Sequence, residues 1–516
     1  MLGEYLPQDP NSGGALSWKA FFKIARTVYR VGLPIALSYT TSAAVLVVAA
    51  LAGRMPGNRE ENQAVSTLII AMLTTWVSVA VAPLFAVNNY VSMRYETRMQ
   101  HCSEISRVLK AGIFLGLPTT LPSMIVMYWA EPFLRDILRQ DAEVSKKAGQ
   151  FSRPYSFALL GIALMRMPIE QILLSFKKQN ALMGMCLAAF AVGVIPSTLL
   201  CFGAGAFPVL SWAGMAYGFQ VETALTILCL GLYLGRNSAF EAFSFFKTLF
   251  TMSCRLKDWQ MFKELFGPGG GGSSLAVTVS QVSVPLVYNA LAGHLPNGRV
   301  ALAAQSYSSF LIFALLIPGW ALAQAVSQET NRCLGDGATL AQRQQAQHFA
   351  RAGLLAIALL IFPICMIVMA CPSIVMRMVS DMGANSAEAD DLAKTTLTIT
   401  ALGLFFEILN NAAVQTLRAL DDHVGPTLRM TAALWIGLAV GFALAKNASW
   451  GLSGLAMGYV VSNFNVLILL GMRFYNHTQL DALNGLSSSR VGGSSLALGA
   501  ARPLLDLTAA ASPNQP

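Results

Sequence analysis

The chain has 516 residues, of which only 12% are charged while 55% are hydrophobic, and its formal net charge is +9. A soluble domain carries about 25% charged residues, so this composition argues against a soluble enzyme and indicates an all-α membrane protein in contact with the lipid bilayer. The basic residues concentrate in short loops, where anionic lipid head groups account for them, and we expect no nucleic-acid partner.

Twelve apolar segments of about 20 residues follow one another along the chain, each long enough to cross a hydrocarbon core about 30 Å thick. They cover residues 31–53, 65–90, 109–130, 154–176, 180–202, 212–235, 275–294, 301–327, 350–371, 395–417, 427–445 and 451–473. We predict five parts: an N-terminal cytoplasmic segment (1–25), an N-lobe (26–236), a cytoplasmic linker (237–272), a C-lobe (273–476) and a disordered C-terminal tail (477–516).

The chain matches itself at a spacing of about 240 residues. ALAGRMPGNR at Ala50–Arg59 returns as ALAGHLPNGR at Ala290–Arg299, and WAGMAYGF at Trp212–Phe219 returns as LSGLAMGY at Leu452–Tyr459. Because each half holds an even number of spans, both halves enter the membrane from the same side. The fold class that follows is twelve transmembrane helices arranged as two parallel six-helix repeats in a two-lobed bundle.

The distribution of basic residues sets the orientation. If the N-terminus is cytoplasmic, most of the 35 Lys and Arg residues fall in cytoplasmic segments, as the positive-inside rule requires. We therefore predict a multi-pass protein of the plasma (inner) membrane with both termini in the cytoplasm, and we expect it to be a monomer.

Charged residues inside spans cost at least about 2.5–3.5 kcal/mol each, so the few present carry most of the functional information. Glu407 lies near the middle of segment 395–417, and Asn410, Asn411 and Arg418 share its face of the helix. We predict that this polar stripe faces a central cavity, with Glu407 as the ion-coupling residue. Interhelical hydrogen bonding is the alternative role for the two Asn residues.

Other intramembrane polar residues have two interpretations each. Arg166 and Glu170 are spaced i, i+4 and either pair with each other or line the cavity. Glu222 is either a second protonatable site or a hydrogen-bonded core residue. Gln281 and Asn289 add polar groups that serve a substrate cavity or ordinary packing.

Metal, nucleotide and catalytic signatures are missing from the sequence. The five His and eight Cys residues form no metal-ligand or paired pattern, and Ser273 stands where a phosphate loop would need Lys. We predict a protein that is not an enzyme and needs no cofactor except a coupling ion, H⁺ or Na⁺. The run GPGGGGSS at Gly267–Ser274 predicts a flexible spacer.

Several motifs resemble the multidrug and toxic compound extrusion (MATE) family. They are GLPIALS at Gly32–Ser38, ALAQAVSQETNRCLGDG at Ala321–Gly337, FFEILNNAAVQTLRALDD at Phe405–Asp422 and LSGLAMGYVVSN at Leu452–Asn463. The resemblance covers residues 26–476 in the family's two-by-six order. It implies a two-lobed, V-shaped secondary antiporter that exports small organic, cationic substrates in exchange for H⁺ or Na⁺ by rocker-switch alternating access.

The same resemblance makes Glu407 the counterpart of the family's cation-responsive acid in helix 10. Many members also carry an acid in helix 1 or helix 7, whereas segment 31–53 offers Ser38 and segment 275–294 offers Gln281 and Asn289. A single-carboxylate, proton-driven mechanism therefore fits these residues better than the usual Na⁺ cage. Two alternatives stay open: a flippase for lipid-linked oligosaccharides of the same superfamily, and a non-transporting membrane scaffold.

Overall fold

The computed structural model describes most of the chain between Trp18 and Leu483. The described residues are 18–39, 47–52, 54–95, 97–203, 208–245, 247, 256–267, 271–335, 339–379, 387–420, 422–447 and 450–483. The compact unit ends at Phe474, and Tyr475–Pro516 form a separate unit. Of the predicted N-terminal segment 1–25, residues 1–17 lie outside the described residues and 18–25 belong to a helix. Of the predicted disordered tail 477–516, residues 477–483 are helical and the rest lies outside the described residues.

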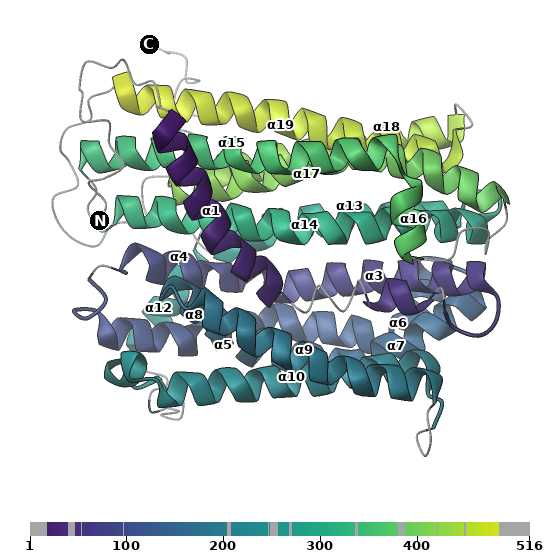
Figure 1. Ribbon diagram of the computed structural model, residues 1–516, viewed down its shortest axis with the longest axis horizontal. Coiled ribbons are helices and arrows are strands. Elements are labelled where there is room, and N and C mark those ends of the chain that lie inside the picture. Colours follow the sequence, from purple (N-terminus) through teal and green to yellow (C-terminus); the bar gives the residue numbers. More distant parts are fainter. Residues whose placement is uncertain are drawn as a thin grey trace, which may run out of the picture. The chain divides into compact units, whose positions relative to one another are not determined.

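The helices of the first half of the chain form one bundle, except that α1 lies across helices of the second half (Figure 1). Its elements, in order, are α1 (Trp18–Ser38), helical residues 47–52, α3 (Arg59–Val81), η2 (Ala82–Leu84), α4 (Phe85–Met93), α5 (Cys102–Tyr128), α6 (Ala130–Pro132), η3 (Phe133–Ile137), α7 (Ala142–Gly161), η4 (Ile162–Arg166), α8 (Met167–Ser175), α9 (Gln179–Phe202) and α10 (Ser211–Arg236). A π-helical turn, η4, joins α7 to α8, so these three elements form one long helix.

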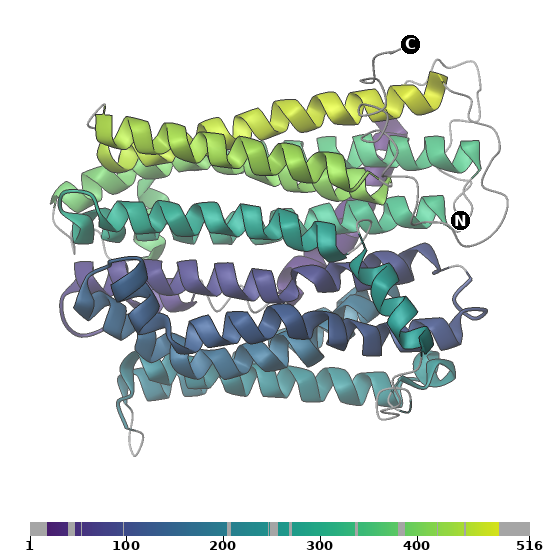
Figure 2. The same ribbon diagram turned by 180° about the vertical axis from the view of Figure 1, so that it is seen from behind.

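The second half forms a bundle beside the first, as the view from behind also shows (Figure 2). After η5 (Ser238–Phe243) and α12 (Leu256–Phe266) it contains α13 (Gly271–Gly293), α14 (Gly298–Leu334), α15 (Leu340–Ala370), α16 (Ser373–Val379), α17 (Ala387–Ala419), α18 (Val424–Asn447) and α19 (Gly451–Leu483). The halves meet mainly through α14 and α13, which pack on α3, and through α1, which packs on α9, α14 and α15.

Eleven helices among the described residues are long and apolar enough to cross a membrane. The twelfth predicted span, 31–53, runs through residues 40–46, which lie outside the described residues. The predicted all-α membrane fold with two helical halves is confirmed.

Two predicted loops are partly helical. Residues 131–153, between the predicted spans 109–130 and 154–176, were expected to form a loop but are helical over most of their length. Asp141 starts α7 at Ala142, because its side chain accepts hydrogen bonds from the backbone N–H groups of Glu143 and Val144. The expected spacer at Gly267–Ser274 enters α13 at Gly271. A Cβ at Gly271 would lie 2.9 Å from the carbonyl oxygen of Pro83, so this glycine allows the start of the second half to touch the first.

The repeat corresponds to matched helix crossings in the two halves. A Cβ at Gly218 of α10 would lie 2.5 Å from Ser197 Cα of α9, and a Cβ at Gly458 of α19 would lie 2.3 Å from Gly441 Cα of α18. Small residues let membrane helices approach closely. The recurring GxxxG spacing in WAGMAYGF and LSGLAMGY is therefore a packing motif, used once in each half.

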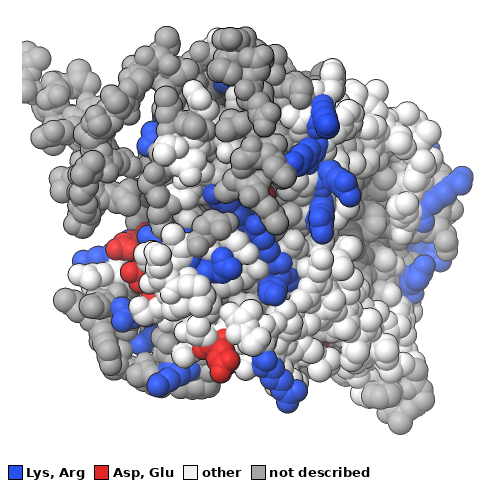
Figure 3. Space-filling view, turned by 60° about the vertical axis from the view of Figure 1, so that its left-hand side comes forward, with Lys and Arg blue, Asp and Glu red and all other residues white. Residues whose placement is uncertain are grey.

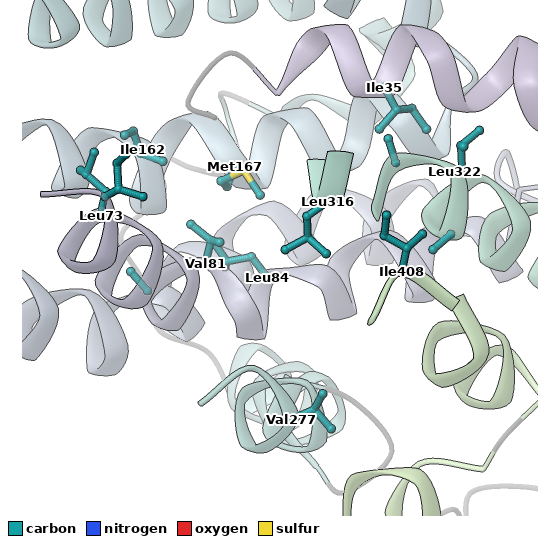
Figure 4. Close-up of a cluster of buried hydrophobic side chains, with 14 of the residues drawn as sticks. Ile35, Leu73, Val81, Leu84, Ile162, Met167, Val277, Leu316, Leu322 and Ile408 are labelled. Atoms are coloured by element: carbon teal, nitrogen blue, oxygen red, sulfur yellow. The ribbon is translucent and has the colours of Figure 1, made fainter. Parts of the chain in front are cut away.

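Buried apolar side chains from both halves fill the interior (Figure 4). Leu73 of α3 and Ile162 of η4 lie together in the first half, while Leu322 of α14 and Ile408 of α17 belong to the second. All four are buried. This packing leaves only a few buried places for polar groups, and those places define the candidate site.

Candidate functional site

A cavity of about 130 Å³ lies where α3 and α7 of the first half face α13, α14, α17 and α19 of the second. Most of its lining is apolar or aromatic, including Phe313 and Trp320 of α14 and Tyr155 of α7. Among the described residues that line it, Glu407 is the one with a formal charge. The predicted cavity between the halves is therefore present, with Glu407 on its wall.

The Glu407 carboxylate is held by Tyr459 of α19, whose hydroxyl donates a hydrogen bond to Oε2 of Glu407. Both side chains are buried, with 8% of each exposed. The ring of Tyr459 lies against Gly403, one turn before Glu407 on α17, where a Cβ would come within 2.5 Å of the ring. Gly403 thus gives Tyr459 the room that its contact with Glu407 requires.

Two further predicted residues, Asn289 and Gln281 of α13, line the same cavity. The side-chain Oδ1 of Asn289 is buried and accepts no hydrogen bond from the described residues. A buried acceptor of this kind is normally satisfied by water or a ligand. Asn289 is therefore a suitable partner for a polar group of a bound molecule. Gln281 is already engaged, because its amide donates to Oδ1 of Asn411.

The two Asn residues of the predicted stripe make contacts between helices. Asn410 donates from Nδ2 to the carbonyl oxygen of Asn463 at 2.8 Å and to its Oδ1 at 3.2 Å, which ties α17 to α19. Asn411 receives the hydrogen bond from Gln281 of α13. Neither Asn is among the described lining residues of the cavity. In this structure both residues form hydrogen bonds between helices instead.

Arg166, Glu170 and Glu222, predicted as cavity residues, lie elsewhere, in a buried cluster inside the first half. Arg166 donates from Nε to Glu170 Oε1 at 2.7 Å and from Nη1 to Glu222 Oε1 at 3.0 Å. The three residues are at most 3% exposed, and the described cavity lining does not include them. Arg166 pairs with Glu170, as one of the two interpretations expected. It also bonds to Glu222 of α10, so the cluster has three members.

The two halves touch on both sides of the cavity. On the side of the α3 and α14 N-termini, Arg299 donates to Asp141 at 2.7 Å, and Gln140 donates to the Ala290 carbonyl oxygen at 3.2 Å. On the opposite side, Gln324 donates to Gln171 Oε1 at 3.0 Å. Each set of contacts therefore holds the two halves together at one end of their interface.

The second of these sides carries a further contact at a helix end. Arg332 of α14 donates to the carbonyl oxygen of Ser175, the last residue of α8, at 3.1 Å. Carbonyl groups at a helix C-terminus lack partners within the helix and attract cations. This contact therefore joins the second half to the end of a first-half helix.

Tyr459 is a site residue that the sequence interpretation missed. Its repeat partner is Phe219, just as the partner of Glu407 is Met167. Both members of the hydrogen-bonded pair are thus polar in the second half and apolar in the first. A search for positions where the repeat changes from apolar to polar would have found Tyr459.

Comparisons with known proteins agree with this fold. The MatE family model matches residues 274–445. The multidrug resistance protein NorM of Burkholderia vietnamiensis is 24% identical over 394 residues, covering 75% of this chain and 81% of that protein. The probable multidrug resistance protein NorM of Rhizobium meliloti (strain 1021) is 24% identical over 386 residues, covering 72% of this chain and 77% of that protein.

Solved structures share the architecture. The eukaryotic MATE transporter AtDTX14 superposes with a TM-score of 0.74 at 17% identity, covering 89% of this chain and 98% of that one. An inward-facing multidrug resistance MATE family transporter of the MOP superfamily superposes with a TM-score of 0.66 at 14% identity, covering 89% and 99% of the two chains. The family model over residues 274–445, the NorM relatives and the shared fold together support the resemblance of this chain to the MATE family of membrane transporters.

Proposed function

We propose that this protein is a secondary exporter of organic cations, driven by an inward flow of protons. The observation that carries the proposal is the buried carboxylate of Glu407 on the wall of an otherwise apolar and aromatic cavity between the halves. The relatives named as multidrug resistance proteins support export of several small molecules.

The chemistry of the lining favours a flat or bulky cation. Aromatic faces such as those of Trp320 and Tyr288 attract organic cations, and a carboxylate adds a specific charge. Asn289 supplies an acceptor for a hydrogen-bonding group of the cargo. Apolar lining with few polar groups is typical of a site that binds varied small molecules.

Glu407 is the proposed coupling residue. Ionised, it attracts the cationic cargo; protonated, it no longer does so, and the cargo is released. A ligand moves a conformational equilibrium only through its different affinity for the two states. Proton and cargo compete for one carboxylate and therefore favour opposite conformations of the transporter. In the resulting rocker-switch cycle, the contacts on the two sides of the cavity would open alternately.

Orientation belongs to the same proposal. Lys and Arg side chains gather on the end of the molecule shown in Figure 3, with few acidic side chains among them. By the positive-inside rule that end faces the cytoplasm. We place both termini there and the protein in the plasma (inner) membrane.

The oligosaccharide-flippase alternative is less well supported. A cavity for a phosphate-linked lipid would be expected to present cations to the phosphates. The described lining has Glu407 and contains neither Lys nor Arg, and Arg166 is paired with two carboxylates inside the first half.

Proteoliposomes with a pH gradient test the proposal. Uptake or release of a fluorescent organic cation, such as ethidium, is followed with and without the gradient. We expect gradient-driven transport in the wild type, loss of it in Glu407→Gln, and wild-type transport in Glu388→Gln, an exposed acid on the same helix. Transport by Glu407→Gln at the wild-type rate would overturn the role of Glu407, and translocation of a glycolipid instead of the cation would overturn the choice of cargo.

A further inference from the structure

We infer that the Arg166–Glu170–Glu222 cluster is a second proton-binding site, which holds one exchangeable proton on Glu170. The cluster joins three elements of the first half: Arg166 ends η4, Glu170 lies in α8 and Glu222 lies in α10. It is separate from the cavity and does not depend on the proposed export function.

The charge of the cluster points to a bound proton. Two carboxylates share one guanidinium, and the three side chains are 0%, 1% and 4% exposed. With both acids ionised the cluster carries one surplus negative charge in the interior of a membrane protein, where water does not solvate it. Charges in such places are normally neutralised by a partner or by a proton.

The second half shows that the helix crossing does not need these charges. At the repeat spacing of 240, Arg166, Glu170 and Glu222 correspond to Phe406, Asn410 and Ser462. There, the equivalent crossing of α17 and α19 is made by neutral amides, since Asn410 donates to Asn463 at 2.8 Å. The same packing is thus achieved without ionisable groups. The charges of the first half therefore require a reason other than architecture.

Glu170 is the better place for the proton. Glu222 accepts hydrogen bonds on both oxygens from Arg166, at 3.0 and 3.2 Å, and from the hydroxyls of Thr226 and Thr223, at 3.2 and 3.4 Å. Glu170 accepts on Oε1 from Arg166 at 2.7 Å and from the Cys186 thiol at 3.7 Å. A proton on the other oxygen of Glu170 leaves a neutral Arg166–Glu222 pair.

Few titratable side chains face the cluster from the neighbouring described elements. Within electrostatic range of the cluster, the other titratable side chains are Cys186 of α9, Tyr155 of α7 and Tyr39, which follows α1. The remaining neighbours present apolar groups: α5 meets α8 and η4 through Gly112 and Gly116, and Leu73 of α3 lies beside Ile162 (Figure 4). Arg166 is therefore the cation that faces Glu170 and Glu222 in the described part of the first half.

Glu170 lies next to a residue, Gln171, that forms a hydrogen bond between the two halves of the protein. Its sequence neighbour Gln171 accepts hydrogen bonds from Asn88 of α4 at 3.1 Å and from Gln324 of the second half at 3.0 Å. The hydroxyl of Tyr39 also bonds to Gln324. A change of charge at Glu170 therefore acts one residue away from a contact that holds the two halves together.

Infrared difference spectroscopy of the whole protein in lipid nanodiscs tests the inference without requiring transport. A protonated carboxylic acid gives a C=O stretching band that a carboxylate lacks, and the band is followed from about pH 5 to about pH 10. We expect a wild-type band that weakens as pH rises and is absent from Glu170→Gln. Glu407→Gln should leave this band in place.

Two further variants make the sign of the charge argument testable. Glu222→Gln removes the surplus charge, so Glu170 should stay ionised beside Arg166 and its band should be lost. Arg166→Gln removes the cation that faces both acids among the described residues, so both acids should be protonated and a second band should appear. Absence of a Glu170 band at every pH, or no gain in Arg166→Gln, would overturn the inference. Loss of the band on adding Na⁺ at acid pH would overturn it in favour of a sodium site.

Discussion

The hydroxyl of Tyr459 donates a hydrogen bond to the carboxylate of Glu407 across the interface of α17 and α19. At the equivalent places of the first half stand Phe219 and Met167, both apolar and both buried. One half has thus acquired a hydrogen-bonded acid on the cavity wall, while the other keeps its acids in a paired cluster. The two halves share a fold and differ in where they hold charge.

Tyr459→Phe should insert and fold normally, because Phe occupies the matching position of the first half. A hydrogen bond to a charged group contributes about 1.5–3 kcal/mol, so we expect gradient-driven transport to fall about tenfold or more and its pH profile to change. Transport rates over a range of pH values check this, with Tyr217→Phe as a control because Tyr217 is 43% exposed on α10. An unchanged rate and profile would show that Tyr459 only fills space.

Gly403→Ala should destabilise the second half. The added Cβ would lie 2.5 Å from the ring of Tyr459, and overpacking of this kind costs about 1–3 kcal/mol. Thermal unfolding of the purified protein measures the effect. Gly231→Ala in α10 is the matched control, because nothing lies within 4 Å of its Cβ, and it should be neutral or slightly stabilising. Equal melting temperatures for the two variants would contradict the described packing.

Removing Arg166 and Glu170 together should be harmful, although the pair looks self-contained in sequence. The double variant Arg166→Met with Glu170→Met leaves Glu222 buried without its cation, and breaking a buried ion pair costs about 3–5 kcal/mol. Adding Glu222→Met should restore stability, since the whole cluster then becomes apolar. Melting temperatures of the double and triple variants decide this, and a double variant as stable as the triple one would count against the three-member cluster.

Asp141→Asn should weaken the contact between the two halves at the end where Asp141 meets Arg299. Asn should still cap α7. The two side chains are 34% and 51% exposed, so the ion pair contributes only about 0.2–1 kcal/mol. We expect up to about a fivefold shift of population toward the state open on that side. Distances between spin labels on α7 and α14 would measure it, with Asp136→Asn as a control because Asp136 pairs with its neighbour Arg135.

The pH dependence of that contact has a defined sign. Burial acts to raise the pKa of Asp141, but the Arg299 guanidinium and the N–H groups of Val144 and Glu143 together hold the pKa below its usual value. A carboxyl with a lowered pKa contributes fully above its ordinary pKa and loses its contribution as pH falls through the lowered value. From about pH 5 to about pH 8 the contact should therefore be constant. A wild-type population that changes within this range, while that of Asp141→Asn stays constant, would refute that assignment.

Single cysteines test the orientation and the parallel repeat together. Pro56 and Pro296 are exposed and occupy equivalent positions of the two halves, and Ser103 and Thr339 are exposed at the opposite helix ends. In a background lacking the exposed Cys371, Cys at Pro56 or Pro296 should react with an impermeant reagent in intact cells. Cys at Ser103 or Thr339 should react only after permeabilisation. Labelling of Pro56→Cys and Pro296→Cys from opposite sides would contradict the repeat.

Much of this arrangement was predictable from residue patterns, and the exceptions have physical causes. The repeat spacing and the buried Glu407 follow from apolar runs and from the cost of charge in a membrane. The pairing of Arg166 with Glu170 follows from helical spacing. The bond from Arg166 to Glu222 does not, because it joins η4 to α10, and their relative rotation depends on packing at Gly161, where a Cβ would lie 3.2 Å from Ile227 of α10.

The linker shows a different kind of limit. The predicted linker was 237–272, with a flexible spacer only at its end, Gly267–Ser274. Within the linker, residues 256–266 form α12, which packs on α5, α4 and α13. In α12, Trp259, Phe262 and Phe266 stack along one face. Aromatic spacing within a polar segment was the available signal. The glycine run that follows α12 predicted flexibility instead. One of its members, Gly271, serves a close helix contact, since a Cβ there would lie 2.9 Å from the carbonyl oxygen of Pro83.

The glycine crossings have a mechanical consequence. At Gly218 and Gly458 no side chain separates the crossing helices. We therefore expect little sliding between α9 and α10 or between α18 and α19, and each pair should move as a rigid body. Bending must then occur where helical hydrogen bonding is already irregular, and the π turn η4 between α7 and α8 is such a joint. Arg166 is the last residue of that turn. Its ion pairs with Glu170 and Glu222 therefore lie at the point where we expect the long helix to bend.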